Sequence, residues 1–271
     1  MKPKISLCAA AARPIYWERF YNSLIKNTTE FEIVFVGPNP PPHNLPDNFK
    51  YIYSEVKPAQ AYEIALRQAT GEIVGWTADD ANYDHPDLNC PRALDLIWNR
   101  YAAFQVDYKD NKTILAMCPH EDSSAQWPNH HFFYAIKETP RMAPFGFINR
   151  EWFNALGGYD RNFICGQSEN DVVMRGLQDG GRVEVVEESV LYVHHGECHT
   201  TDGYVFRKGY DSDRKFLEEC WVKEGYGTYD VRAPYTLSTT RLRPLEPFSD
   251  ENILVENQGP AGRWAKEGAK V

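Results

Sequence analysis

The stretch AYEIALRQATGEIVGWTADD, residues 61–80, places a helix, a turn and a strand directly before two acidic residues. Small and apolar side chains recur in its first half at the spacing that predicts a helix with one buried face, at Ala61, Ile64, Ala65 and Ala69. Gly71 fits the C-terminal cap of that helix. Residues 72–76 then predict a short buried strand that leads to Asp79 and Asp80.

The same alternation of strand and helix extends through the first 120 residues. Working outward, strands are expected at residues 4–7, 31–36 and 51–53, and helices at residues 17–25 and after Asp87. This order predicts an α/β domain with a mostly parallel central sheet flanked by helices. Ligands in such sheets bind beyond the carboxyl ends of the strands, which here are followed by residues 9–13, 37–39 and 77–80.

The second half of the chain has a less regular pattern. Strands are expected at residues 113–117, 183–186 and 190–193, helices from Asn149 and Ser168, and a long loop over residues 119–144. Beyond Gly225 the sequence is rich in loop residues. A chain of 271 residues is therefore expected to form one domain over residues 1–224, with an irregular C-terminal extension and mobile tail over residues 225–271.

Composition excludes several classes of partner. The net charge of −9 argues against binding long nucleic acids through counterion release, and against docking on an anionic membrane by bulk charge. The longest uncharged apolar run, residues 5–12, is far shorter than the ~20 residues of a membrane-spanning helix. Six scattered cysteines without a C-x-x-C pair favour reduced thiols and a cytoplasmic location.

Two segments carry carboxylates that could act in chemistry. Asp79 and Asp80 at a strand end suit Mg²⁺ or Mn²⁺, which take one or two protein carboxylates together with phosphate oxygens. A solvated turn that caps a helix is the alternative. In residues 167–175, Ser168 and Asp171 match a capping box, and the other interpretation is a carboxylate at the helix mouth that acts as general base.

Histidines gather in residues 192–199, where a structural zinc site is disfavoured because no second cluster has finger spacing. His194 and His195 are adjacent on an expected strand, so only one of them can face a given site. One of them could complete a metal site that begins at Asp80. The sequence contains no Walker loop, no G-x-S-x-G elbow, no H-E-x-x-H motif and no G-x-G-x-x-G after its first strand.

Taken in order, these segments resemble the inverting GT-A glycosyltransferases of family 2, from about Lys4 to His195. The opening strand with Arg13 is similar to the first nucleotide-contacting loop of that family. Residues 61–76 are similar to its helix and strand before the acidic metal motif, and His85-Pro86-Asp87-Leu88 matches what usually follows. Residues 146–160 resemble the acceptor-side segment, and Glu169-Asn170-Asp171 with Arg175 stands where the family keeps its acidic helix.

The resemblance implies that an acceptor hydroxyl attacks the anomeric carbon of a nucleotide-sugar while a carboxylate takes its proton and the nucleoside diphosphate leaves. The acceptor would be a glycan or another hydroxyl compound, and UDP-sugars are the favoured donors. Glu169 is implied as the base, with Asp171 as second choice. The implied donor and metal residues are Ala10, Arg13, Gly37, Trp76, Asp79 and Asp80, and the Mn²⁺ or Mg²⁺ ion would also use His195 or, less favourably, His194.

The chain departs from the family pattern at four places. Ala78 stands where many members have the first Asp of D-x-D, and Gly37-Pro38 replaces an acidic residue after the second strand. Tyr62-Glu63 stands where Arg-Asn is frequent, and Glu169 replaces the usual aspartate. Two other functions are therefore kept open, a sugar-phosphate nucleotidyltransferase and a catalytically silent sugar- or nucleotide-binding protein.

Aromatic residues make up 14% of the chain, and sugars can stack their C–H faces on such rings. Core packing is expected for most of them, notably Trp17, Phe20, Trp98 and Phe153. Trp76, Trp127 and Phe147 are the candidates for a site. Arg241 and Arg243 are expected to be surface charges, with closure over the diphosphate as the alternative.

Overall fold

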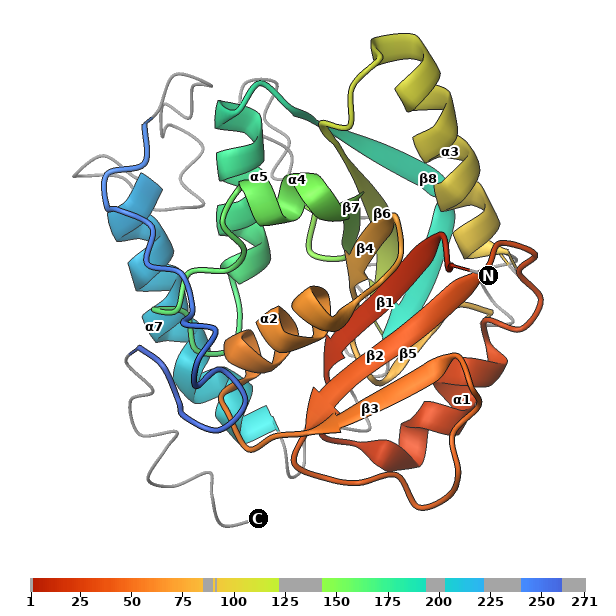
Figure 1. Cartoon of the computed structure of the whole chain (residues 1–271), viewed down its shortest axis with the longest axis horizontal. Helices are drawn as coiled ribbons and strands as arrows, with labels where there is room; N and C mark the ends of the chain where they lie inside the picture. The colour runs from red at the N-terminus through yellow and green to blue at the C-terminus, as the bar shows by residue number, and fades with distance from the viewer. Residues whose placement is uncertain are drawn as a thin grey trace.

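The computed structural model describes residues 2–84, 90, 92–121, 143–193, 203–221 and 240–259. Their strands form one sheet in the order β3-β2-β1-β4-β7-β6-β8-β5, with helices on both faces (Figure 1). The strands are β1 (Ile5–Ala10), β2 (Phe31–Gly37), β3 (Phe49–Tyr53), β4 (Ile73–Trp76), β5 (Ala81–Asn82), β6 (Thr113–Glu121), β7 (Gly146–Asn149) and β8 (Arg182–Val193). The helices are η1 (Pro14–Tyr16, a 3₁₀ helix), α1 (Trp17–Asn22), α2 (Pro58–Gln68), α3 (Ala93–Tyr108), α4 (Arg150–Ala155), α5 (Ser168–Gln178) and α7 (Gly203–Trp221).

The first half of the sheet is parallel, as the sequence predicts. Strands β3, β2, β1 and β4 are hydrogen-bonded side by side in the same direction. Successive side chains of a strand point to opposite faces, so Ile33 and Phe35 of β2 enter one core while Val34 and Val36 enter the other. Burial on both faces explains why these strands read as continuous apolar runs. The parallel arrangement brings the carboxyl ends of β1, β2 and β4 to one edge of the sheet.

The second half of the sheet is mixed. Strand β7 is antiparallel to both β4 and β6, β6 is parallel to β8, and β5 is antiparallel to β8. The two strands expected at residues 183–186 and 190–193 are one continuous strand, β8. Its pairing with β6 shifts register between Ala116 and Cys118, and the exposed Glu187 and Glu188 lie at this irregularity. A bulge lets polar residues reach solvent without ending a strand, so the polar interruption misled the prediction.

Helices cover both faces of the sheet (Figure 1), and the buried side chains form two hydrophobic cores. Helices α2, α4, α5 and α7 contribute to one core, for example through Ile64, Phe153, Val173 and Leu217. Helices α1 and α3 contribute to the other, for example through Trp17, Phe20, Leu94 and Ile97. The predicted burial of Trp17, Phe20 and Phe153 is confirmed, and Trp98 is partly buried against the same core.

Helix α1 is shorter than the predicted helix over residues 17–25. It ends at Asn22, because the Ser23 hydroxyl donates to the Phe20 carbonyl at 2.7 Å and accepts from the Tyr83 N–H at 3.0 Å. Ile25, expected on the buried face, is 58% exposed. A serine that bonds to nearby backbone competes with continuation of a helix.

The described C-terminal segment, residues 240–259, is irregular as expected but is attached to α2. The Gln60 amide donates to the carbonyls of Ile253 and Glu256 at 2.6 Å each, and its oxygen accepts the Gln258 N–H at 2.8 Å. Gln60 is fully buried, so these bonds are shielded from water. The boundary expected after residue 224 stays a prediction, because residues 222–239 lie outside the described part.

The remaining expectations concern membrane-spanning helices and the state of the cysteines. Within the described ranges, no helix combines the length and the apolar character needed to cross a bilayer. The cysteines described there are free thiols, namely Cys8, Cys90, Cys118, Cys165 and Cys220. Cys198 lies outside the described residues.

Candidate functional site

The candidate site begins where β1, β2 and β4 end. The Ala11 N–H donates to the Val36 carbonyl at 2.8 Å, and the Thr77 N–H donates to the Cys8 carbonyl at 3.0 Å, so the three strand ends are held together. Gly37 is required at this edge because a Cβ there would lie 1.8 Å from the Ala11 carbonyl oxygen. The structure thus brings together Ala10, Arg13, Gly37, Asp79 and Asp80, all predicted from sequence.

Arg13 bridges the two acidic residues. Its Nε donates to Asp79 Oδ1 at 2.9 Å, its backbone N–H donates to Asp79 Oδ2 at 2.8 Å, and its Nη2 also contacts Asp79 Oδ1. Its Nη1 donates to Asp80 Oδ2 at 2.9 Å. The indole Nε1 of Trp17 lies 3.5 Å from Asp79 Oδ2. The acidic pair is therefore neither a solvated turn nor a helix cap, because both carboxylates are 1% exposed.

The donor set suits a hard divalent cation. Two buried carboxylates at a strand end are the ligands that Mg²⁺ and Mn²⁺ take in proteins together with substrate phosphates. In this structure the positive charge beside the two carboxylates comes from the guanidinium of Arg13, which pairs with both of them. Burial raises the pKa of Asp79 and the charge of Asp80 adds to that rise, while Arg13 opposes it. A positive partner is what keeps such buried carboxylates ionised.

Trp76 and Phe147 belong to the core and do not face the site edge. The indole Nε1 of Trp76 donates to the Ala143 carbonyl at 2.8 Å, and the residue is 3% exposed. The ring of Phe147 covers Gly75, where a Cβ would lie 2.3 Å from it. Strand β4 is buried on both faces, so the Trp76 ring is covered by protein in this structure. Its predicted contact with the donor stays a prediction. Trp127 lies outside the described residues.

Tyr62 of α2 contacts the chain segment that leads from β4 to the acidic pair. Its hydroxyl donates to the Thr77 carbonyl at 2.6 Å. Burial raises the pKa of Tyr62, and the negative charges of Asp79, Glu169 and Asp80 raise it further. The charges of Glu169 and of the acidic pair thus both disfavour ionisation of one buried tyrosine.

Glu169 is a partly exposed carboxyl in the first turn of α5. Burial raises its pKa to about 7, and the nearby charge of Asp213 contributes to the rise. Asp213 of α7 is itself held by three backbone N–H donors, from Ile164 at 2.8 Å, Cys165 at 2.7 Å and Gly166 at 2.9 Å. A carboxyl with a pKa close to neutrality can both accept and release a proton at physiological pH.

Asp171 has a different environment from Glu169. It is fully buried, and it accepts from Arg175 Nε at 2.9 Å, Arg241 Nε at 2.9 Å and Trp221 Nε1 at 2.8 Å. Burial raises its pKa, but the two arginines and the indole outweigh burial and hold the pKa below its usual value. A carboxylate stabilised in this way is a poor proton acceptor, so the second choice of base does not fit the structure.

The capping box predicted at Ser168 and Asp171 is also wrong. Gln167 precedes the helix in a left-handed conformation with φ of 64°, and its carbonyl accepts the Asp171 N–H at 3.1 Å. Ser168 is already inside the helix, and the Asp171 carboxylate is used by the arginines. The Asp171 side chain thus forms ion pairs with Arg175 and Arg241 and does not cap the helix.

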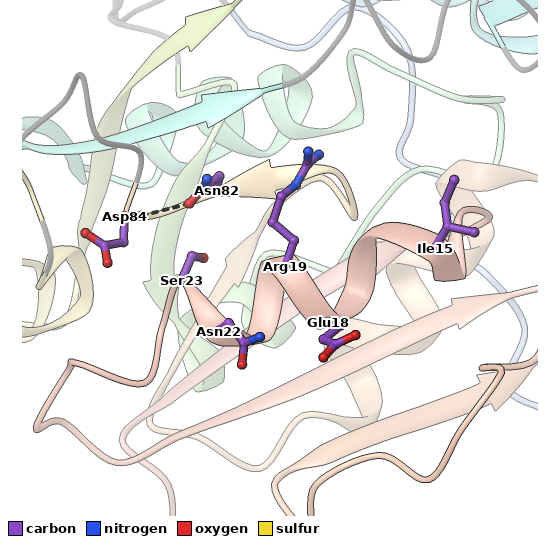
Figure 2. Close-up of a pocket in the computed structure, with 7 residues that line it drawn as sticks. All are labelled: Ile15, Glu18, Arg19, Asn22, Ser23, Asn82 and Asp84. Carbon is purple, nitrogen blue, oxygen red and sulfur yellow. Dashed lines mark hydrogen bonds between the residues drawn. The ribbon is translucent and has the colours of Figure 1, made fainter.

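A pocket of about 510 Å³ lies against η1, α1 and β5. Figure 2 shows Arg19 rising from α1 toward Asn82, whose side chain accepts the Asp84 N–H at 3.0 Å. The lining residues are Ile15, Glu18, Arg19, Asn22, Ser23, Asn82 and Asp84. Two lining residues are close in sequence to the acidic pair and its arginine: Ile15 is two residues after Arg13, and Asn82 is two residues after Asp80. Two residues of chain span at most about 7 Å. Carboxylates, amides and a guanidinium line the pocket, which suits a ligand rich in hydroxyl groups.

The late metal ligand cannot be placed. His194 and His195 lie outside the described residues, so their role stays a prediction. In the part of the chain that the structure describes, no three His, Cys, Asp or Glu side chains gather as a metal site would require.

Sequence reasoning missed the residues that support the acidic helix. Arg241 is only 7% exposed and also bonds Asp160 Oδ2 through Nη2 at 2.7 Å, which corrects its prediction as a surface charge. Asp213 and Trp221 come from α7, far along the chain. No local pattern marks these residues, because their partners are distant in sequence.

No protein-family model matches the chain, and no curated protein matches its sequence. Solved structures do match. The mannosyltransferase PcManGT from Pyrobaculum calidifontis, solved with GDP-Man and Mn²⁺, aligns with a TM-score of 0.51 at 18% identity, over 71% of this chain and 57% of that one. TarS residues 1–349 from S. aureus align with a TM-score of 0.50 at 17% identity, over 76% and 64% of the two chains.

A longer TarS structure from S. aureus gives a TM-score of 0.50 at 16% identity, covering 70% of this chain and 36% of that chain. This chain thus aligns with 36% to 64% of the length of these neighbours. The chain has a GT-A fold: one α/β domain whose sheet is covered by helices on both faces.

Proposed function

We propose that the chain is a metal-dependent, inverting glycosyltransferase that moves a sugar from a nucleoside-diphosphate sugar to an acceptor hydroxyl. The observation that carries the proposal is a buried acidic pair at the strand ends that Arg13 bridges. Glu169, whose pKa burial raises to about 7, supports it. The GT-A fold supports the same class of reaction, and PcManGT is a neighbour solved with a nucleotide-sugar and Mn²⁺.

Glu169 is the proposed general base. Its pKa of about 7 leaves a large fraction ionised at neutral pH, and it is the partly exposed member of the acidic helix. It takes the proton of the acceptor hydroxyl as that oxygen bonds to the anomeric carbon. Attack from the face opposite the leaving diphosphate inverts the configuration at that carbon.

Asp79 and Asp80 are the proposed holders of Mn²⁺ or Mg²⁺. When bound, the ion supplies positive charge to the leaving diphosphate. Ala10, Arg13 and Gly37 form the edge against which the donor would lie. A UDP-sugar is the favoured donor. After the second strand this chain has Gly37-Pro38 where the family often has an acidic residue.

The acceptor is proposed to be a glycan or another hydroxyl compound. The polar pocket between α1 and β5 supports this class, because it presents donors and acceptors at Glu18, Arg19 and Asn82 (Figure 2). Hydroxyl-rich ligands are held by such side chains.

The test combines donor binding with turnover. A thermal-shift panel of nucleoside diphosphates and nucleotide-sugars, with and without Mn²⁺, should find a ligand that stabilises the fold by about 2.7 kcal/mol at a hundred times its Kd. Glu169→Gln should then lower kcat by roughly 10²–10⁴-fold with donor binding unchanged, as expected for loss of a general base.

Glu151→Gln is the matched control, because Glu151 is an exposed glutamate in the first turn of α4. It should leave kcat unchanged. Wild-type turnover by Glu169→Gln would refute the base, and the absence of a metal-dependent shift with every nucleotide would refute the donor class.

The two other functions differ in their products. A nucleotidyltransferase would release pyrophosphate from a nucleoside triphosphate and a sugar phosphate. A silent binding protein would be stabilised by a nucleotide-sugar and transfer nothing. Product analysis with the stabilising ligand distinguishes all three.

A further inference from the structure

We propose that Arg13, by binding the acidic pair, prevents a divalent cation from binding there. A diphosphate that binds the guanidinium of Arg13 frees the carboxylates, so that the cation and the nucleotide bind together. The proposal deepens the proposed function, and only its nucleotide part depends on that function. Arg13 thereby acts as a positioning residue that couples two ligands.

The contacts of Arg13 occupy the oxygens that a cation would use. Both oxygens of Asp79 are engaged, Oδ1 by Arg13 Nε at 2.9 Å and Oδ2 by the Arg13 backbone N–H at 2.8 Å. Arg13 Nη1 holds Asp80 Oδ2 at 2.9 Å. A guanidinium that spans two carboxylates makes charge-assisted bonds that a hydrated cation must replace one by one.

Of the three side chains in this cluster, that of Arg13 is the most exposed and therefore the one that can move. The carboxylates of Asp79 and Asp80 are each 1% exposed, whereas the Arg13 side chain is 22% exposed. The backbone N–H of Arg13 is fixed on Asp79, so only the side chain can swing outward without disturbing β1. The way from solvent to the acidic pair therefore involves the guanidinium.

Charge explains why a cation alone does not displace Arg13. The pair and Arg13 together carry one net negative charge, and a dication that arrives beside the guanidinium meets a like charge. A diphosphate changes this balance, because its oxygens accept the guanidinium in a bidentate manner and also complete the coordination of the cation. After the exchange Arg13 pairs with phosphate, and the cation pairs with the carboxylates and phosphate.

The experiment measures Mn²⁺ binding by electron paramagnetic resonance, first with Mn²⁺ alone and then with saturating UDP. Wild type should bind Mn²⁺ alone weakly, and UDP should tighten binding at least about tenfold, within the usual range for coupled sites. Arg13→Gln should bind Mn²⁺ alone at least about tenfold more tightly than wild type and lose most of the effect of UDP.

Two controls identify the cause. Arg100→Gln removes an exposed arginine of α3 and should leave Mn²⁺ affinity unchanged, which excludes a general effect of net charge. The double variant Arg13→Gln/Asp80→Asn should lose the tighter Mn²⁺ binding, because the ion then lacks a ligand. Arg13→Lys keeps the positive charge but not the planar set of donors, so its affinity for Mn²⁺ should lie between those of wild type and Arg13→Gln. It replaces Arg13→Gln in the test if Arg13→Gln does not fold.

The outcomes separate the two proposals. If Arg13→Gln binds Mn²⁺ no more tightly than wild type, or if wild type binds Mn²⁺ equally well without UDP, the closing role of Arg13 is refuted even in an active enzyme. If Arg13→Gln gains Mn²⁺ affinity but no nucleotide binds either protein, the closing role stands for the cation and the proposed function fails.

Discussion

Glu169 and Asp171 lie two residues apart in the first turn of α5, yet their pKa values shift in opposite directions. Burial and the charge of Asp213 raise the pKa of Glu169 to about 7. At Asp171 the neighbouring Arg175, Arg241 and Trp221 overcome burial and lower the pKa. The opposite shifts fit the proposed role of Glu169 in proton transfer and a structural role for Asp171.

The first prediction concerns the pH dependence of transfer. A base must be ionised, so kcat should rise with pH through about 7, the pKa to which burial raises Glu169. The negative charge of Asp213 disfavours ionisation of Glu169. Asp213→Asn should therefore lower the pKa of Glu169 and move the rising limb of the profile to lower pH.

Asp211→Asn is the matched control, because Asp211 lies on the same helix but is exposed. Its pH profile should coincide with that of wild type. Asp213 also accepts three backbone N–H groups, so the melting temperature of each variant should be recorded at every pH used. An unchanged limb in folded Asp213→Asn would contradict the assignment of Glu169.

At the scale of elements, Arg241 joins the C-terminal segment to the acidic helix and to the turn before it. Its Nε bonds Asp171 of α5 and its Nη2 bonds Asp160, and both carboxylates are fully buried. Leu156 and Gly158 are held to the same helix through Arg175. The proposed base on the first turn of α5 thus lies on a helix that ion pairs fix from several sides.

The second prediction concerns the stability that Arg241 provides. Arg241→Gln leaves the buried carboxylate of Asp160 without its arginine and leaves Asp171 paired with Arg175 alone. Breaking a buried pair in this way costs about 3–5 kcal/mol. Arg243→Gln should cost only about 0–1 kcal/mol, because Arg243 is 53% exposed and its pair with Glu219 is screened by water. Denaturant unfolding measures both variants. Equal losses of stability would contradict the buried role of Arg241.

Local sequence patterns could predict only part of these elements. The alternation of apolar strands and amphipathic helices is a local property, so the parallel strands β1 to β4 and helices α2 and α3 were accessible. The insertion of β7 beside β4 and the continuity of β8 depend on partners far along the chain. The site divides in the same way: Asp79, Asp80 and Glu169 stand in motifs, but the bond from Arg241 to Asp171 spans 70 residues.

At the scale of the whole molecule, α2 connects the functional parts. The Tyr62 hydroxyl donates to the Thr77 carbonyl, two residues before the acidic pair, and Gln60 of the same helix holds the C-terminal segment. The other end of that segment is fixed to α7, since the Leu242 N–H donates to the Cys220 carbonyl at 2.7 Å. Residues 240–259 are therefore expected to unfold with the domain and not before it.

The third prediction tests this cooperativity by native-state hydrogen exchange. The amides of Leu242 and Gln258 should exchange only through global unfolding, because their acceptors are the α7 carbonyl of Cys220 and the buried Gln60 side chain. Val255, which is 84% exposed and bonds only within a local turn, should exchange much faster.

Gln60→Ala supplies the decisive comparison. It removes the acceptor of Gln258 but not that of Leu242, and each lost hydrogen bond is worth about 0.5–1.5 kcal/mol. Exchange at Gln258 should therefore accelerate toward the rate at Val255, while Leu242 stays protected by its bond to α7. If Gln258 already exchanges as fast as Val255 in wild type, the segment is not part of the cooperative unit, and the support it gives to the acidic helix must come from Arg241 alone.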